Sequence, residues 1–139
     1  MEQCLEYNIL LERAYKMIPS KSIVRERFEV EEPEVMVTGK RTFVLNFKKI
    51  CDDMNREPEI LLRYLLKELG ASGNREEDVA VIYGVFSSKM IKELINLFLK
   101  SYVYCSVCGS PDTILRREER KLMQLKCMAC GALTPVKPF

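Results

Sequence analysis

The sequence predicts an α+β protein in three parts: an N-terminal amphipathic helix, a central unit of helices with a small, mostly antiparallel sheet, and a C-terminal unit organised by cysteines. Apolar residues recur at helical spacing near the N-terminus, strand-like and helix-like runs alternate between residues 35 and 104, and two Cys-x-x-Cys pairs follow. A chain of 139 residues, 47% hydrophobic and 30% charged, suits one main domain with a small appendage. We therefore expect a partner-binding or back-folded helix over 1–20, a linker over 21–34, a central domain over 35–104 and a last domain over 105–139.

The first predicted helix, over residues 3–18, has one apolar stripe. Its members are spaced three and four apart: Tyr7, Leu10, Leu11, Ala14, Met17 and Ile18. Pro19-Ser20 ends the helix, and the charged stretch that follows is acidic near its end and broken by Pro33, which is typical of a linker. The helix can fold back onto its own chain or dock in a groove of another protein, and the pattern leaves both open.

The central unit is predicted to begin with a hairpin and two helices. Residues 35–37 and 42–45 are strand-like and meet around the turn Thr38-Gly39-Lys40. Asn46 is expected to cap a helix that runs through Ile50 and Met54. Pro58 opens a second helix that stops at Gly70. The inward residues of that helix are leucines: Leu61, Leu62, Leu65, Leu66 and Leu69.

The second half of the central unit is predicted as a turn, a strand and a helix. Ser72-Gly73-Asn74 is the turn, and the apolar run 79–83 suits a central strand. Ser87 or Ser88 caps the last helix. Its inward residues are Ile91, Leu94, Ile95 and Phe98.

Four cysteines near the C-terminus have the spacing of a metal site. Cys105 and Cys108 form one pair, Cys127 and Cys130 the other, with eighteen residues between the pairs and a glycine after each. This spacing is typical of a structural zinc site, because Zn²⁺ takes four thiolates in a tetrahedron. Two short strands, 113–116 and 122–126, are expected between the pairs, joined by the charged turn 117–120. The pattern predicts a zinc ribbon that holds one structural Zn²⁺ in a closed site.

Other interpretations of the cysteines fit less well. Disulfides need an oxidising compartment, and the N-terminus lacks an apolar signal segment. A thiol oxidoreductase needs only one Cys-x-x-Cys pair and a βαβ context. Iron in a four-thiolate site remains compatible with the ligands. The two further cysteines, Cys4 and Cys51, are expected to be ordinary reduced thiols, since no histidine stands beside them.

Several function classes are disfavoured by what the sequence lacks. It contains no histidine, the commonest general base, and no pair of carboxylates set in an apolar context. It has neither a P-loop nor a G-x-G-x-x-G motif, so we expect no nucleotide bound by this chain. No apolar run approaches the ~20 residues of a membrane span. We expect a cytoplasmic protein that is not an enzyme.

Charge is unevenly distributed although the net value is only +2. Residues 1–38 are net acidic, and the two later parts are net basic. Any contact with RNA phosphates would therefore be local. The candidate side chains are Lys40, Arg41, Lys48, Lys49, Arg116, Arg117, Arg120 and Lys121. For the last four, a solvated hairpin turn explains the charges equally well.

Several runs of this sequence are highly similar to one family. They are Arg56-Glu57-Pro58, Phe86-Ser87-Ser88-Lys89, the stretch from Tyr102 to Thr113, and Leu125 to Ala132. The chain resembles, over its whole length, the beta subunit of archaeal translation initiation factor two. The eukaryotic beta subunit and the N-terminal region of initiation factor five share the central unit and ribbon.

The resemblance implies a role for each part. Members form a heterotrimer with alpha and gamma subunits, in which gamma binds GTP and makes most of the contact with initiator methionyl-tRNA. The complex delivers that tRNA to the small ribosomal subunit. The N-terminal helix attaches to gamma, which implies gamma contacts for Tyr7, Leu10, Leu11, Ala14 and Tyr15. The other two parts modulate tRNA binding and the GTP cycle. Members often carry a basic residue where this chain has Val85, so an RNA contact at that position is not expected here.

Two functional hypotheses follow from different classes. The leading one is a non-catalytic subunit of a translation initiation complex, tethered by its first helix. The alternative is a stand-alone zinc-ribbon RNA-binding protein that uses the ribbon and the basic side chains of residues 39–49.

Overall fold

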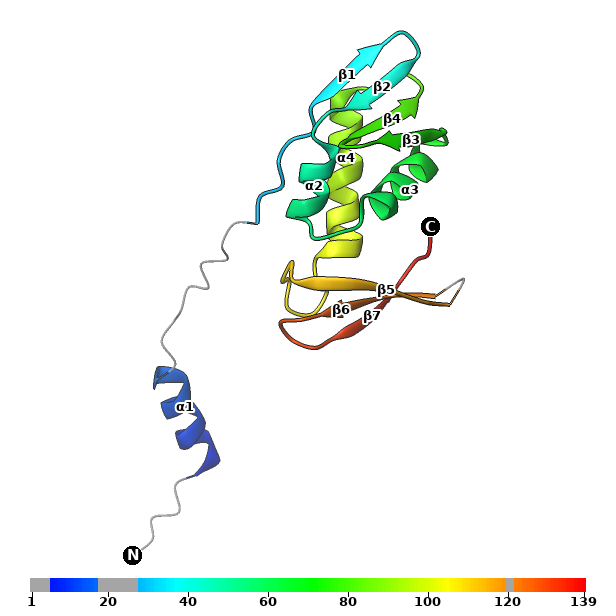
Figure 1. Cartoon of the computed structure of the whole chain (residues 1–139). Helices are drawn as coiled ribbons and strands as arrows, with labels where there is room; N and C mark the ends of the chain where they lie inside the picture. Colours follow the sequence, from blue (N-terminus) through cyan, green and yellow to red (C-terminus); the bar gives the residue numbers. More distant parts are fainter. Residues whose placement is uncertain (1–5, 18–27, 120–121) are drawn as a thin grey trace, which may run out of the picture.

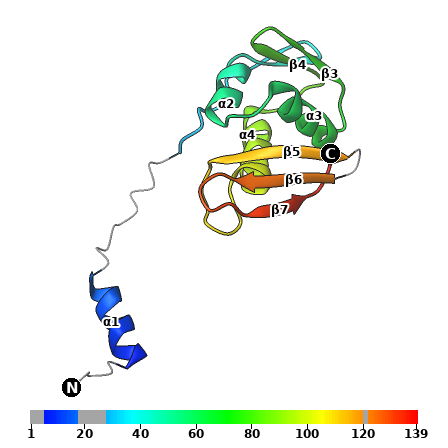
Figure 2. The same cartoon turned by 60° about the horizontal axis from the view of Figure 1, so that its bottom comes forward.

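The computed structural model describes residues 6–17, 28–119 and 122–139. Two antiparallel sheets are separated by three helices, α2 (Phe47–Asp53), α3 (Pro58–Leu69) and α4 (Ser88–Phe98) (Figure 1). The view in Figure 2 shows the same layering from another side. Helix α1 (Tyr7–Met17) stands apart from both sheets (Figure 1). The α+β class predicted from the sequence is confirmed.

The first sheet has four strands in the order β1-β2-β4-β3, with every neighbouring pair antiparallel. The strands are β1 (Val35–Thr38), β2 (Arg41–Val44), β3 (Gly73–Glu76) and β4 (Val79–Tyr83). Alternate residues of β2 and β4 face the helices and are fully buried: Thr42, Val44, Ala80 and Ile82. The β1–β2 hairpin and the β4 strand appear where the sequence predicted them.

Three helices cover one face of this sheet and form the core. They are α2 (Phe47–Asp53), α3 (Pro58–Leu69) and α4 (Ser88–Phe98). Pro58 occupies the first turn of α3, and Gly70 ends it with φ of 60°, a conformation that glycine adopts without strain. The Ser87 hydroxyl accepts a hydrogen bond from the Met90 backbone N–H at 3.3 Å, as expected of a helix cap. The largest fully buried side chains include Phe47, Phe98, Ile50, Met54, Leu61 and Leu65.

The prediction that the Asn46 side chain caps α2 was wrong. Asn46 stands before the helix, but its side chain accepts from the Glu34 backbone N–H at 2.9 Å and donates to the Glu32 carbonyl oxygen at 2.8 Å. Residues 28–34 are thereby held against the central unit, with Pro33 buried. Two ion pairs add to this attachment, Glu31 with Lys49 and Glu32 with Lys92.

One other local prediction in the central unit was wrong, and one element was not predicted. The segment Ser72-Gly73-Asn74 is not simply a turn, because Gly73 begins β3, which pairs along its length with β4. The chain approaches so closely there that a Cβ on Gly73 would lie 2.3 Å from the Val81 carbonyl oxygen. In addition, α4 continues into a five-residue π-helix, η1 (Leu99–Val103), which the sequence pattern did not indicate.

The second sheet belongs to the C-terminal unit and has three strands in the order β5-β6-β7. They are β5 (Thr113–Glu119), β6 (Leu122–Cys127) and β7 (Leu133–Val136). The predicted turn over 117–120 was wrong, because Arg117 to Glu119 belong to β5, which bulges there. Strand β7 was not predicted, since its alternation spans only four residues and includes Pro135.

The two units share a packed junction. Rings from the helices and from the C-terminal segment contact one another, with centroids 5.1 to 6.4 Å apart: Tyr64, Phe98, Tyr102 and Phe139. The Tyr102 hydroxyl donates to the Lys137 carbonyl oxygen at 2.9 Å. The cysteine-bearing unit is therefore fixed to the central one in this structure.

Candidate metal centre and partner-binding surfaces

The two cysteine pairs lie in turns with nearly the same backbone geometry. In the first, the Gly109 N–H donates to the Cys105 carbonyl oxygen at 2.9 Å; in the second, the Gly131 N–H donates to that of Cys127 at 3.1 Å. Both glycines have positive φ, 70° and 76°, which explains why glycine follows each pair. The second turn also donates from Met128 N–H to the Asp112 carbonyl oxygen at 2.8 Å, which ties the turns together.

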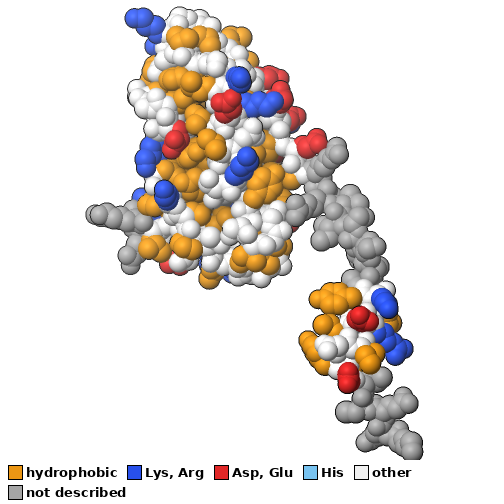
Figure 3. All heavy atoms as spheres, turned by 180° about the vertical axis from the view of Figure 1, so that it is seen from behind, with side chains coloured by type: hydrophobic (Ala, Val, Ile, Leu, Met, Phe, Trp, Pro, Cys, Tyr) orange, Lys and Arg blue, Asp and Glu red, His pale blue; other side chains and the backbone are white. Residues whose placement is uncertain are grey.

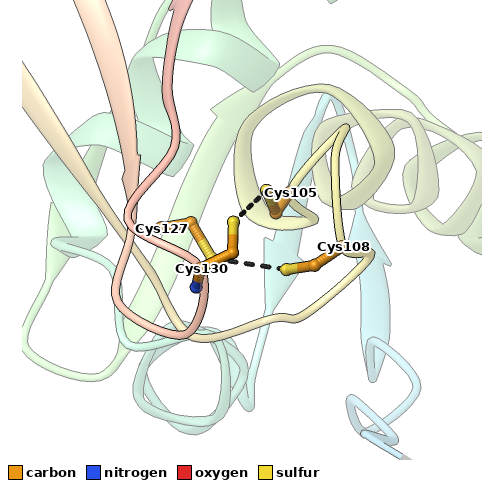
Figure 4. Close-up of side chains that lie close together, drawn as sticks. All are labelled: Cys105, Cys108, Cys127 and Cys130. Carbon is orange, nitrogen blue, oxygen red and sulfur yellow. Dashed lines mark hydrogen bonds between the residues drawn. The ribbon is translucent and has the colours of Figure 1, made fainter. Parts of the chain in front are cut away.

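The four sulfurs converge on one point (Figure 4). All four Sγ atoms lie within 4.8 Å of one another, with 3.7 Å between those of Cys105 and Cys130 and 3.5 Å between those of Cys108 and Cys127. A tetrahedron with Zn–S bonds of about 2.3 Å has edges of about 3.8 Å. The cluster can therefore hold one metal ion without a large movement of the turns, and every ligand position would be filled by the protein.

Backbone donors already favour thiolate at one cysteine of each pair. The backbone N–H groups of Cys108 and Val107 lower the pKa of the Cys105 thiol to about 6. That of Cys130 likewise lowers the pKa of Cys127. The donated Val107 N···Sγ distance is 3.4 Å. Because a metal ion binds thiolates, these backbone N–H groups favour the metal-binding form of Cys105 and Cys127 before an ion is bound.

The remaining thiol, Cys51, has a different environment. It is fully buried in the central core, and burial raises its pKa to about 12. This agrees with the prediction of an unreactive thiol, since the thiolate is the reactive form. Cys4 lies outside the described residues.

Helix α1 exposes the apolar stripe predicted from its sequence as far as Met17, whereas Ile18 lies outside the described residues. None of its residues is buried, and Figure 3 shows its hydrophobic side chains uncovered, away from the rest of the molecule. Tyr7 is 74% exposed and Tyr15 68%, while Leu10, Leu11 and Ala14 are exposed as well. The five residues expected to bind a partner thus lie on one 11-residue helix without a described contact to the core.

The basic residues predicted from the sequence have different surroundings where the structure describes them. Lys48 pairs with Asp78, at 3.1 Å between Nζ and Oδ1, and Lys49 with Glu31. The Arg41 guanidinium instead lies over the Tyr83 ring, 5.4 Å from its centroid, and Lys40 is exposed in the neighbouring turn. Arg116 and Arg117 are exposed on β5, whereas Arg120 and Lys121 lie outside the described residues. Val85 is 65% exposed beyond β4.

Sequence reasoning missed the residue that joins the two units, Arg56. Its guanidinium is buried and donates to the Thr113 carbonyl oxygen at 2.6 Å, the Thr113 hydroxyl at 2.6 Å and the Tyr102 carbonyl oxygen at 3.0 Å. Burial lowers its pKa to about 10. An arginine between two helices is usually a surface residue, so the sequence did not indicate that Arg56 is buried at the junction.

Among the described residues, no helix is long and apolar enough to cross a membrane.

Comparison with known proteins places these features in a family. A family model for a domain found in initiation factors 2B and 5 matches residues 19–133. The chain is 47% identical over 137 residues to translation initiation factor 2 subunit beta of Thermofilum pendens, covering 97% of this chain and 96% of the relative. It is 43% identical to the protein of that name from Saccharolobus solfataricus, covering 96% of each, and 41% identical to that from Methanocaldococcus jannaschii, covering 95% and 92%. With this family match and this identity over nearly the whole length, the chain belongs to the family of translation initiation factor 2 beta subunits.

Proposed function

We propose that this chain is the non-catalytic beta subunit of a heterotrimeric initiation factor, anchored to a GTP-binding gamma subunit by α1. The factor delivers initiator methionyl-tRNA to the small ribosomal subunit in the cytoplasm, with an alpha subunit joined through the complex. The beta subunit modulates tRNA binding and the GTP cycle. Support comes from the names of the relatives and, above all, from the isolated apolar helix.

The exposure of α1 is the observation that carries the anchoring role. An isolated 11-residue helix is marginal in water, so its stripe needs a surface to cover it. Burying Tyr7, Leu10, Leu11 and Tyr15 would contribute roughly 6–12 kcal/mol before the costs of association and ordering. That range is enough for a stable complex through one helix lying in a groove.

The four-cysteine cluster is assigned a structural role in this proposal. We propose Zn²⁺ as the ion, because four thiolates suit a borderline-soft metal that prefers a tetrahedron. Cys105, Cys108, Cys127 and Cys130 would hold it and leave no position for a substrate. When bound, the ion would fix the two turns from which β5, β6 and β7 extend.

The anchoring role is tested by calorimetric titration of the purified gamma subunit. The titrants are the full chain, a chain of residues 28–139, and full chains with Leu11→Asp or, as a matched surface control, Leu97→Asp. Leu97 is 51% exposed on α4 and lies outside the proposed anchor. We expect the full chain and the Leu97→Asp chain to bind alike, and the other two to lose most of their affinity. Equal binding by the 28–139 chain would refute the anchor.

A further inference from the structure

The four-stranded sheet has an open outer face that the described helices do not cover. Helices α2, α3 and α4 all lie on its other side (Figure 1, Figure 2). Because side chains alternate along a strand, the residues between the buried ones point outward. On β2 these are Arg41 and Phe43, and on β4 they are Val81 and Tyr83.

Strand register brings two aromatic rings together on this face. Phe43 is opposite Val81, and Arg41 is opposite Tyr83, so Phe43 and Tyr83 are diagonal neighbours on adjacent central strands. Tyr83 is 45% exposed, Phe43 is half-buried, and Val81 beneath them is almost fully buried. As diagonal neighbours, Phe43 and Tyr83 offer two separate rings, each of which a flat ligand can contact.

A positive charge is held at the same place. The Arg41 guanidinium carbon lies 5.4 Å from the Tyr83 ring centroid, within the range of a cation–π contact. Lys40 is exposed in the turn that precedes it. The nearest acidic positions along the strands, Glu34 and Glu76, lie at the opposite end of the sheet, beside Val35 and Val79. Four residues of strand separate the two ends, about 13 Å.

These features favour nucleic acid over a protein as the ligand. Met36, Phe43 and Val81 form a short apolar row across this face. A protein-docking face is typically a larger continuous apolar patch, whereas here polar and charged residues lie around the row: Thr38, Arg41, Asn74 and Glu76. Exposed aromatics next to a cation on an open antiparallel sheet suit unpaired bases, which stack on the rings while their phosphates meet the charge.

We propose that the outer face of this sheet binds single-stranded nucleic acid, with bases stacked on Phe43 and on the Tyr83 ring with its overlying Arg41 guanidinium, whose charge also meets a phosphate. Lys48 and Lys49 do not belong to the site, because each is paired with a carboxylate on α2's side of the unit. The site is separate from the anchor on α1 and from the cysteine cluster. It does not rest on the proposed subunit role.

The test measures fluorescence anisotropy of labelled octauridine with the full chain and its variants, between about 50 and 200 mM salt. Loss of one stacked base corresponds to about 5- to 150-fold weaker binding. We expect Tyr83→Ala to weaken binding by at least fivefold without changing the salt dependence, and Tyr83→Phe to bind like the original chain. Arg41→Gln should instead reduce the slope of log affinity against log salt by about 0.7, the value for one phosphate on a single strand.

Two controls make the result specific. Leu97→Ala removes an exposed apolar side chain from α4, on the other side of the sheet, and should leave the affinity unchanged. A blunt duplex of the same length should bind without dependence on Tyr83, because its bases are already stacked. Unfolding curves check that each variant is folded. Phe43→Leu removes the second ring but keeps an apolar side chain over Val81, and it should also weaken binding.

The proposal is overturned by any of three results: no octauridine binding at reachable protein concentrations, Tyr83→Ala with unchanged affinity, or equal losses for single strand and duplex. A self-association that Tyr83→Ala abolishes, without octauridine binding, would assign this face to a second copy and also overturn it.

Discussion

Removing the Arg56 side chain should loosen the junction between the two units. Arg56 donates two hydrogen bonds to Thr113 of the C-terminal part and one to the carbonyl oxygen of Tyr102, in η1 at the end of the central unit. Hydrogen bonds from a charged donor contribute about 1.5–3 kcal/mol each. Part of this total is offset, because the guanidinium is buried without a carboxylate partner among the described residues, which is why its pKa falls to about 10. We expect Arg56→Ala to lower the free energy of unfolding by about 3–5 kcal/mol, because the buried carbonyl oxygens of Thr113 and Tyr102 lose their charged donor.

Urea unfolding of the full, metal-loaded chain, followed by circular dichroism, measures this change. Arg63→Ala is the matched control, because Arg63 is exposed on α3 and its removal should change stability by less than about 0.5 kcal/mol. Arg56→Lys should recover only part of the loss, since one ammonium cannot reproduce the guanidinium fork. If Arg56→Ala costs less than about 1 kcal/mol, these hydrogen bonds do not hold the junction and our account of it is wrong.

Three further outcomes follow from the structure. The purified chain should contain one metal ion per cluster of four thiolates. A strong chelator should unfold β5–β7, whereas the amides of the four-stranded sheet should stay protected from hydrogen exchange. Protection of both sheets after chelation would contradict a structural ion. Lowering the pH from about 7 to 5 should release the ion, because protons compete for the thiolates, and a colorimetric metal indicator would detect it. Gly73→Ala should lower the free energy of unfolding by about 1–3 kcal/mol, since the new Cβ would lie 2.3 Å from the Val81 carbonyl oxygen. Gly39→Ala has open space around the new Cβ but a φ of 62°, and should lower it by about 1–2 kcal/mol. If urea unfolding shows Gly73→Ala to be as stable as the original chain, the two strands can separate at that point.

The sequence predicted the elements that strong local signals define. Pro58 and Gly70 bounded α3, the Ser87 hydroxyl capped α4, and the turn at Gly39 joined β1 to β2. What failed depended on contacts that the residue types at those positions do not signal. Gly73 begins a strand because β4 offers an edge, and Asn46 turns from its helix because the carbonyl oxygen of Glu32 and the backbone N–H of Glu34 lie within its reach.

The same division holds for the sites. Four cysteines at the right spacing were enough to predict the cluster, because the turn geometry is local and repeats around Gly109 and Gly131. The aromatic pair on the open sheet was not predicted, since Phe43 and Tyr83 become neighbours only through the pairing of β2 with β4. Likewise, Lys48 pairs with Asp78, 30 positions away, and Lys49 with Glu31, 18 positions away. Ion pairs over such sequence separations cannot be predicted from a local pattern.

The central claim, that α1 is the anchor to the gamma subunit, is tested most directly by amide hydrogen exchange of the full chain with and without gamma. In the free chain, the amides of residues 7–17 should exchange rapidly, because a short exposed helix is marginally stable. In the complex, those amides should become strongly protected, while exchange in β1–β4 stays nearly unchanged. Protection confined to the sheets or the cysteine turns, with residues 7–17 still exchanging rapidly, would contradict the account.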